Sequence, residues 1–195
     1  MRRQLSLLPS PLPEGFTYLP AFLGPTEEAD LLDRFSRLDW KEVRMHGVVA
    51  RRRVVHYGLD YTYDSRSVRP TDPPPAWLLP LQEKAARPMG VRTSEIAEVL
   101  LSKYPTGAGI GWHRDAPMFG DAVFGVSLGG ECVLRLRYNE GDKPLSIELE
   151  PRSAYLLSGN ARWNWRHSIP PVKGLRYSIT FRTLRQTGKP QAVVS

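Results

Sequence analysis

The second half of the chain alternates between apolar and polar residues with a period of two. Four segments show this pattern, at about residues 123–128, 132–138, 145–150 and 175–182. Turn-forming residues separate them, in the stretches Gly129-Gly130, Asn139-Glu140-Gly141-Asp142 and Ser158-Gly159-Asn160. Because successive side chains of a strand point to opposite faces, short alternating segments separated by turns predict an all-β sandwich or barrel over about residues 97–184.

The first part of the chain combines helical and extended patterns. Residues 26–38 have apolar side chains at helical spacing, and Pro25 followed by acidic residues is typical of a helix start. A second helix is predicted at about 75–87, although Pro80 interrupts its pattern. Residues 47–63 look extended. We therefore expect a mainly β fold with flanking helices that pack on the outside of the sheets.

The composition points to a single domain, residues 1–195, in a reducing compartment. This is the usual size of one domain, and a chain of this length folds without disulfides. Cys132 is the only cysteine and is expected to pack in the core. No apolar run approaches about 18 residues, and Pro9, Pro11 and Pro13 argue against a signal peptide. We expect a cytoplasmic monomer, or a nuclear one in a eukaryote, with no membrane partner.

Arginine accounts for 21 of the 27 basic residues, and the net charge is +7. The guanidinium group binds phosphate through paired hydrogen bonds, so a polyanionic partner such as nucleic acid is one explanation of this excess. The other explanation is that a basic composition serves only solubility. The charge alone fits both explanations equally.

Two histidines and one aspartate form a candidate metal site. His113 and Asp115 are two residues apart, so in an extended segment their side chains project from the same face. His167 lies 52 residues further along the chain. Two imidazoles and one carboxylate form the facial triad that binds non-haem Fe(II) and leaves positions open for a substrate and O₂. Taken alone, the two-residue spacing fits a surface histidine beside an aspartate better.

The segment at residues 175–182 carries a candidate anion site. Arg176 and Arg182 lie on one face of the predicted strand, and the opposite face is apolar. Arginine binds carboxylates through paired, charge-assisted hydrogen bonds, so this face is suited to a dicarboxylate near His167. An exposed strand with solvated arginines gives the same pattern, and the pattern alone leaves both possibilities open.

Further motifs follow one another from about residue 97 to residue 184. The longest is Tyr104-Pro105-x-Gly107-x-Gly109-Ile110-Gly111-Trp112-His113-x-Asp115. The others are Ser127-Leu128-Gly129, Ser158-Gly159, Asn164-Trp165-Arg166-His167-Ser168-Ile169 and Arg176-Tyr177-Ser178-Ile179-Thr180-Phe181-Arg182. In order and spacing they resemble the AlkB family of Fe(II)/2-oxoglutarate dioxygenases, and residues 12–16 and 53–63 are similar to the front of that family. The resemblance covers nearly the whole chain and implies a double-stranded β-helix, or jelly-roll, core.

This resemblance implies a role for each matching residue. The implied Fe(II) ligands are His113, Asp115 and His167. Arg176 would bind the distal carboxylate of 2-oxoglutarate beside Tyr104, and Arg182 would lie at the end of the cosubstrate that chelates iron. Ser102 and Ser178 stand at positions where many family members have asparagine. A serine hydroxyl still donates one hydrogen bond but reaches less far, so the cosubstrate contacts at these two positions stay open.

The resemblance also implies a substrate-recognition lid over about residues 12–65. The candidate substrate-binding residues are Arg53, Tyr57, Tyr61, Tyr63 and Trp112. Arginines contact phosphates, and a base stacked on an aromatic ring contributes about 1–3 kcal/mol. The alternative is that the tyrosines are half-buried strand residues and the arginines are solvated. Likewise, Trp112, Trp163 and Trp165 either wall the site against water or pack in the core.

The implied reaction oxidises a substrate C–H bond with Fe(II), 2-oxoglutarate and O₂ and yields succinate and CO₂. At an N-methyl group the hydroxylated product releases formaldehyde, so the leading hypothesis is oxidative demethylation of alkylated nucleic acid bases. Pro117 stands where some repair members carry an acidic residue that reads the base, so the identity of the base is not implied. Two alternatives stay open: the same chemistry on a protein side chain or small molecule, and a non-catalytic nucleic-acid-binding module.

Overall fold

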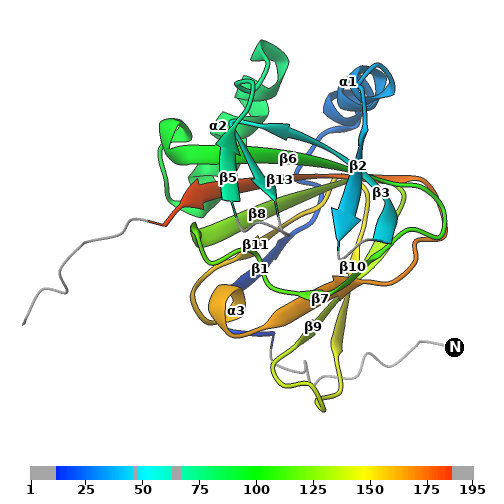
Figure 1. The fold of residues 1–195 in the computed structure, drawn as a ribbon, viewed down its shortest axis with the longest axis vertical. Coiled ribbons are helices and arrows are strands. Elements are labelled where there is room, and N and C mark those ends of the chain that lie inside the picture. Colours follow the sequence, from blue (N-terminus) through cyan, green and yellow to red (C-terminus); the bar gives the residue numbers. More distant parts are fainter. Residues whose placement is uncertain (1–11, 46–47, 63–66, 186–195) are drawn as a thin grey trace, which may run out of the picture.

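Two antiparallel sheets form the centre of the protein (Figure 1). The computed structural model describes residues 12–45, 48–62 and 67–185. The larger sheet has seven strands, which in spatial order are β1 (Phe16–Leu19), β11 (Ala154–Leu157), β8 (Phe119–Gly129), β13 (Arg176–Leu184), β6 (Ile96–Tyr104), β3 (Val48–Tyr57) and β2 (Lys41–Met45). The smaller sheet has four, which are β10 (Leu145–Leu149), β9 (Cys132–Arg137), β12 (Arg166–Ile169) and β7 (Ile110–His113). This mainly β architecture confirms the predicted fold class.

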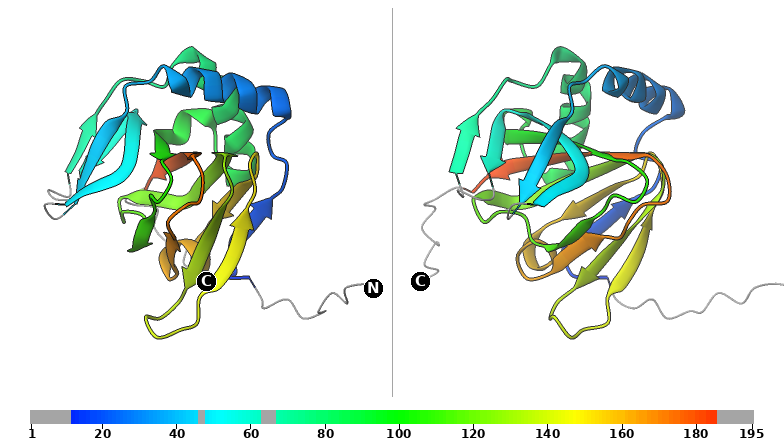
Figure 2. Two further views of the ribbon diagram at one scale, coloured as in Figure 1. Left: turned by 90° about the vertical axis from the view of Figure 1, so that its right-hand side faces the viewer. Right: turned by 45° about the vertical axis from the view of Figure 1, so that its right-hand side comes forward.

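The remaining elements flank the two sheets. Strands β4 (Leu59–Thr62) and β5 (Ser67–Pro70) form a separate pair. Helices α1 (Pro25–Ser36) and α2 (Leu79–Met89) cover the face of the larger sheet that points away from the smaller one (Figure 2). Three short elements complete the fold, namely the 3-10 turns Ala76–Leu78 and Thr93–Glu95 and helix α3 (Gly159–Trp163). None of the helices in the described ranges is long and apolar enough to cross a membrane.

The larger sheet has a different apolar cluster on each face. On the outer face, Phe124 and Val126 of β8 pack with Ile179 of β13 under the two helices. On the inner face, Val123 of β8 packs with Leu134 of β9, so this cluster joins the two sheets. The period-two pattern of β8 and β13 therefore reflects two buried faces, one against the helices and one toward the space between the sheets. Cys132 is buried in the inner cluster, which confirms that it is a core residue.

Both predicted helices are present. In α1, Pro25 occupies the first turn, and the Glu27 side chain accepts a hydrogen bond of 2.7 Å from the Gly24 backbone N–H. In α2, Pro80 also lies in the first turn. Backbone N–H groups in the first turn have no hydrogen-bond partner within the helix, so proline, which lacks this N–H, is tolerated there. Pro80 therefore begins this helix instead of interrupting it.

The extended region and one turn differ in detail from the prediction. Residues 47–63 contain two strands, β3 and β4, which are separated at Gly58. Gly58 has φ +78°, and a Cβ there would lie 2.3 Å from the Ala97 carbonyl oxygen, so the break needs glycine. The Ser158-Gly159-Asn160 stretch, predicted as a turn, begins helix α3. Strand β1 was not predicted, and it pairs with β11 at the edge of the larger sheet.

Phe35 joins α1 to the larger sheet. Its fully buried ring contacts Trp40, Trp77 and Tyr177 at centroid distances of 5.9, 6.2 and 5.4 Å. Phe35→Ala is expected to lower the free energy of unfolding by about 3–5 kcal/mol, measured by urea denaturation, because it removes a large side chain from a packed core. Leu79→Ala is the control, since Leu79 is 45% exposed, and should change this free energy by less than about 1 kcal/mol. Equal losses in the two variants would contradict this packing.

Candidate active site

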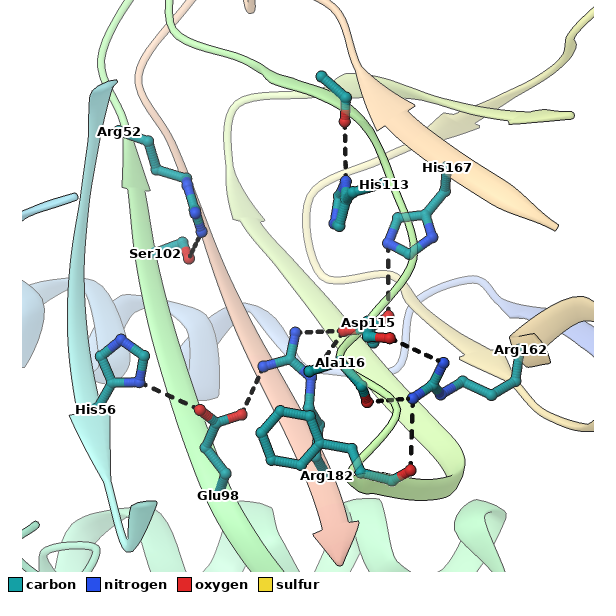
Figure 3. Close-up of polar contacts among 12 residues, drawn as sticks. Arg52, His56, Glu98, Ser102, His113, Asp115, Ala116, Arg162, His167 and Arg182 are labelled. Atoms are coloured by element: carbon teal, nitrogen blue, oxygen red, sulfur yellow. Dashed lines mark hydrogen bonds and ion pairs between the residues drawn. The ribbon is translucent and has the colours of Figure 1, made fainter. Parts of the chain in front are cut away.

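Strand pairing brings the two histidines of the candidate site together. Strands β7 and β12 are antiparallel, and His113 is the direct cross-strand partner of His167. The centroids of the two rings lie 4.2 Å apart. Asp115 follows β7, and its Oδ2 atom lies 3.6 Å from His167 Nε2 (Figure 3). The fold therefore brings His167 next to two residues that lie more than fifty positions earlier in the sequence.

Asp115 is also paired with Arg182 of β13. Arg182 Nε donates a hydrogen bond of 2.8 Å to Asp115 Oδ1, and Nη2 contacts the same oxygen. Arg182 Nη1 donates to Glu98 Oε2 of β6 at 2.5 Å, and Glu98 Oε1 lies 3.2 Å from His56 Nδ1. Arg182 and both carboxylates are buried. A chain of ionic and polar contacts therefore runs from β3 to the candidate metal site (Figure 3).

Burial and nearby charges set the protonation of the three candidate ligands. Burial, together with repulsion from His113, lowers the pKa of His167 to about 3. Burial also lowers the pKa of His113, with smaller effects from Arg52 and Arg182. Burial raises the pKa of the Asp115 carboxyl, but the Arg182 guanidinium and the other nearby cations outweigh it and hold this pKa well below its usual range. At neutral pH the imidazoles are neutral and the carboxylate is ionised, as metal binding requires.

The atoms left without partners fit a divalent cation. Asp115 Oδ2 is buried and accepts no hydrogen bond from the described part of the chain. His113 Nδ1 lies 2.9 Å from the Gly111 carbonyl oxygen and donates to it, which leaves the lone pair of the neutral ring on Nε2. Across the described ranges, no three His, Cys, Asp or Glu side chains have the spacing of a closed metal centre as they stand. Two imidazoles and one carboxylate are nevertheless the donor set that suits Fe(II).

Arg176 lies in the same cavity and is 1% exposed. Its Nε donates a hydrogen bond of 3.1 Å to Ser127 Oγ, and its guanidinium carbon lies 4.9 Å from the ring centroid of Tyr104. Its Nη1 is buried and has no hydrogen-bond partner within the described ranges. The alternative of an exposed strand with solvated arginines is therefore wrong. A buried guanidinium with an unpaired N–H is suited to a carboxylate.

A single cavity joins these groups. Its polar lining consists of Arg52, Ser102, Tyr104, His113, Asp115, Tyr155, His167, Arg176, Ser178, Thr180 and Arg182. Its apolar lining consists of Leu100, Ile110, Val123 and Ile169. The structure thus brings together every residue predicted from the sequence for the metal and the cosubstrate.

Of the predicted substrate-binding residues that the structure describes in full, Arg53, Tyr57 and Trp112, none lines this cavity. Arg53 pairs with Glu42 Oε1 at 2.6 Å, and Tyr57 packs against the cluster under the helices. Both lie on the face of β3 opposite to Arg52, because side chains alternate along a strand. Trp112 stacks against Arg137, whose guanidinium carbon lies 4.2 Å from the ring centroid. Tyr63 and the side chain of Tyr61 lie outside the described residues.

None of the three tryptophans, Trp112, Trp163 and Trp165, lines this cavity. Trp163 Nε1 donates a hydrogen bond of 2.6 Å to Asp121 Oδ1, and Trp165 packs edge-on against Tyr138 at a centroid distance of 5.7 Å. The walls of the cavity are aliphatic side chains from β6, β7, β8 and β12 instead. Which aromatic side chains face a cavity depends on how the loops pack, and the sequence pattern does not contain that information.

Sequence reasoning missed Glu98, Arg162 and Arg52. Glu98 had a signal, since it is a carboxylate among the apolar residues of the first half of β6. Arg162 holds the loop that carries Asp115, because its Nη1 and Nη2 donate to the carbonyl oxygens of Asp115 and Ala116 at 3.3 and 2.9 Å. Arg52 looked in the sequence like the arginines on either side of it, and only the strand register turns it toward the cavity.

Comparison with known proteins identifies the family. A model of the 2OG-Fe(II) oxygenase superfamily matches residues 15–182. The chain belongs to this superfamily. It is 30% identical over 184 residues to an Arabidopsis thaliana "Alkylated DNA repair protein ALKBH8 homolog", covering 82% of this chain and 51% of the relative. It is 29% identical over 167 residues to a Xenopus tropicalis "tRNA (carboxymethyluridine(34)-5-O)-methyltransferase alkbh8", and the match covers 83% of this chain and 26% of that relative. The AlkB-family chain thus spans a quarter to a half of these relatives.

Solved structures of the superfamily share the fold. OsALKBH1 matches with a TM-score of 0.71 and 16% identity, covering 87% of this chain and 96% of that one. A Burkholderia pseudomallei 2OG-Fe(II) oxygenase family oxidoreductase matches with a TM-score of 0.60 and 17% identity, and the match covers 90% of this chain and 88% of that one. These matches confirm the jelly-roll core. Membership also confirms the expected enzyme class, a 2-oxoglutarate-dependent dioxygenase, for which Fe(II), 2-oxoglutarate and O₂ are the general requirements.

The lowered pKa of His167 predicts that the metal-free AlkB-family protein loses stability in acid. An unfolded histidine titrates near pH 6.5, whereas folded His167 titrates near pH 3. Between these values the unfolded chain binds the extra proton, so the contribution of His167 is complete above about pH 6.5 and falls as the pH decreases. The expected slope from this site is about 1.4 kcal/mol per pH unit, measured by urea denaturation with a chelator present.

His167→Gln tests the origin of that slope. Glutamine does not titrate, so the variant should lose the His167 part of the acid sensitivity and keep the smaller part from His113. Identical slopes for the parent and the variant between about pH 6.5 and 4.5 would show that His167 is not buried as a neutral ring.

Proposed function

We propose that this protein is an oxidative demethylase of alkylated nucleic acid that uses Fe(II) and 2-oxoglutarate. One observation carries the proposal. A single cavity contains two buried polar atoms without hydrogen-bond partners in the described part of the chain, Asp115 Oδ2 and Arg176 Nη1. The first atom suits a cation and the second an anion. A divalent metal and a dicarboxylate bound side by side would satisfy both atoms.

In this proposal His113, Asp115 and His167 hold the metal. Bound Fe(II), together with 2-oxoglutarate and O₂, supplies the oxidation of a substrate C–H bond. Arg182 occupies Asp115 Oδ1 and leaves Oδ2 for the metal. Arg162 donates to the backbone carbonyl oxygens of Asp115 and Ala116, which fixes the backbone that carries the carboxylate.

The other residues of the cavity bind the cosubstrate and exclude water. Arg176 takes the distal carboxylate, with the Tyr104 ring beside its guanidinium. Ser178 lies on the same face of β13 and offers a hydroxyl donor. The aliphatic wall formed by Ile110, Ile169 and their neighbours keeps bulk water from the reacting carbon.

Two observations support nucleic acid as the substrate class. The names of the two relatives refer to alkylated DNA repair and to a tRNA uridine. The net charge of +7 comes mainly from arginine, which binds phosphates. We also propose that residues 1–195 form one domain that works as a monomer in the cytoplasm or nucleus, where the free thiol of Cys132 would stay reduced.

Turnover of 2-oxoglutarate against methylated single-stranded DNA, methylated RNA and methylated peptides tests the proposal. We expect succinate and formaldehyde in equal amounts with one of the methylated oligonucleotides, and background levels with its unmethylated counterpart. Mass spectrometry measures both products. His167→Ala should lower turnover by more than about 100-fold, because it removes a proposed metal ligand.

Asn164→Ala is the matched control, since Asn164 is exposed and lies three residues before His167. It should keep the turnover of the parent. Stimulation by a methylated peptide but by no oligonucleotide would contradict the substrate class. Salt-sensitive binding of oligonucleotides without any consumption of 2-oxoglutarate would contradict the proposed enzymatic activity. It would favour a non-catalytic nucleic-acid-binding module.

A further inference from the structure

The three arginines that line the cavity differ in their partners. Arg182 is paired with two buried carboxylates. Among the described residues, Arg176 and Arg52 have no carboxylate partner, and their side-chain hydrogen bonds go to the hydroxyl groups of Ser127 and Ser102 at 3.1 and 3.2 Å. Both side chains are buried, with 1% of Arg176 and 6% of Arg52 exposed. The cavity therefore contains two buried positive charges that no carboxylate of the described residues balances.

Arg52 reaches the cavity from the edge of the larger sheet that β3 and β2 form. It belongs to β3, and its side chain points toward Ser102 of β6 (Figure 3). In the ladder between β6 and β13, Ser102 pairs with Ser178, two residues along from Arg176. Because alternate residues of a strand share a face, the hydroxyl that Arg52 contacts lies one row of side chains from Arg176. The two unbalanced arginines thus line the same cavity.

A bound dicarboxylate would balance this pair. A buried charge without a counter-charge is unfavourable, and a hydroxyl oxygen satisfies an N–H donor without neutralising the cation. The third arginine does not meet this need, because Arg182 already uses Nε, Nη1 and Nη2 on Asp115 and Glu98. Two carboxylates on one ligand match two arginines, and each guanidinium binds a carboxylate through charge-assisted hydrogen bonds.

We propose that Arg52 binds one carboxylate of 2-oxoglutarate while Arg176 binds the other. The inference rests on the proposed function for the identity of the ligand, and it assigns to the cosubstrate a residue of the lid strand. Binding of the cosubstrate then holds the inner edge of β3 in place before the substrate arrives.

Calorimetric titration of the full chain with 2-oxoglutarate, with Mn(II) as a redox-inert metal, tests this role. Arg52→Gln should weaken binding about 10- to 100-fold, the range for loss of a hydrogen bond between charged groups. Arg52→Lys keeps the charge and should lose less. Arg53→Gln is the matched control for cosubstrate affinity, since it removes the same charge from the opposite face of β3, and should stay within about twofold of the parent.

Thermal melting separates ligand binding from a structural role. If the role of Arg52 is to bind an anion, the ligand-free Arg52→Gln variant should melt at the same temperature as the ligand-free parent or at a higher one. The substitution removes a buried charge that has no counter-charge. The increase in melting temperature on adding 2-oxoglutarate should shrink in the variant. Ser102→Asn in the Arg52→Gln background should recover part of the affinity, because an amide supplies a new N–H donor at the same place.

Each contrary result has a different meaning. Parent-like affinity of Arg52→Gln for 2-oxoglutarate would overturn the role of Arg52 and leave the proposed function intact. A large fall in the melting temperature of the ligand-free variant, with a normal increase on adding 2-oxoglutarate, would overturn it in favour of a structural role. Failure of the Mn(II)-loaded parent to bind 2-oxoglutarate would overturn the proposed cosubstrate and this inference together.

Discussion

The site depends on the ion pairs between Arg182 and two buried carboxylates. Arg182 uses one side of its guanidinium group on Asp115 and the other on Glu98, so it fixes the loop after β7 against the centre of the larger sheet. With only one carboxylate, part of the buried Arg182 guanidinium would have no hydrogen-bond acceptor. Without Arg182, the buried Asp115 carboxyl would be costly to ionise. The second carboxylate lets Arg182 hold Asp115 through one oxygen and leave the other for a cation.

Strand β13, which carries Arg182, contributes one face to core packing and the other to the cavity. One face of β13 supplies apolar side chains to the cluster under the helices, and the other supplies Arg176 and Arg182 to the cavity. This division needs both faces to be buried, and the two layers around the larger sheet provide that burial. Low solvent access then lowers the pKa values of the two histidines and strengthens every charge interaction in the cavity.

The sequence predicts the parts of this molecule that a local pattern determines. Alternation over β8 and β13 predicts their strands and the shared face of Arg176 and Arg182, because the side-chain period of a strand is two. Arg52 and Arg53 show where this reasoning ends. A shift of one residue in register exchanges the two faces of a strand, and the pairing of β3 with β6, which no local pattern encodes, turns Arg52 inward and Arg53 outward. Alternation alone therefore did not single out Arg52 as the arginine of this segment that lines the cavity.

A crystal structure of the protein with Mn(II) and 2-oxoglutarate is the most direct test of how the cavity works. We expect one metal ion in contact with His113, Asp115 and His167, and a 2-oxoglutarate molecule whose far carboxylate is hydrogen-bonded to Arg176. A metal ion bound elsewhere, or 2-oxoglutarate outside the cavity while Arg176 Nη1 keeps no partner, would contradict the proposed binding of metal and cosubstrate in this cavity.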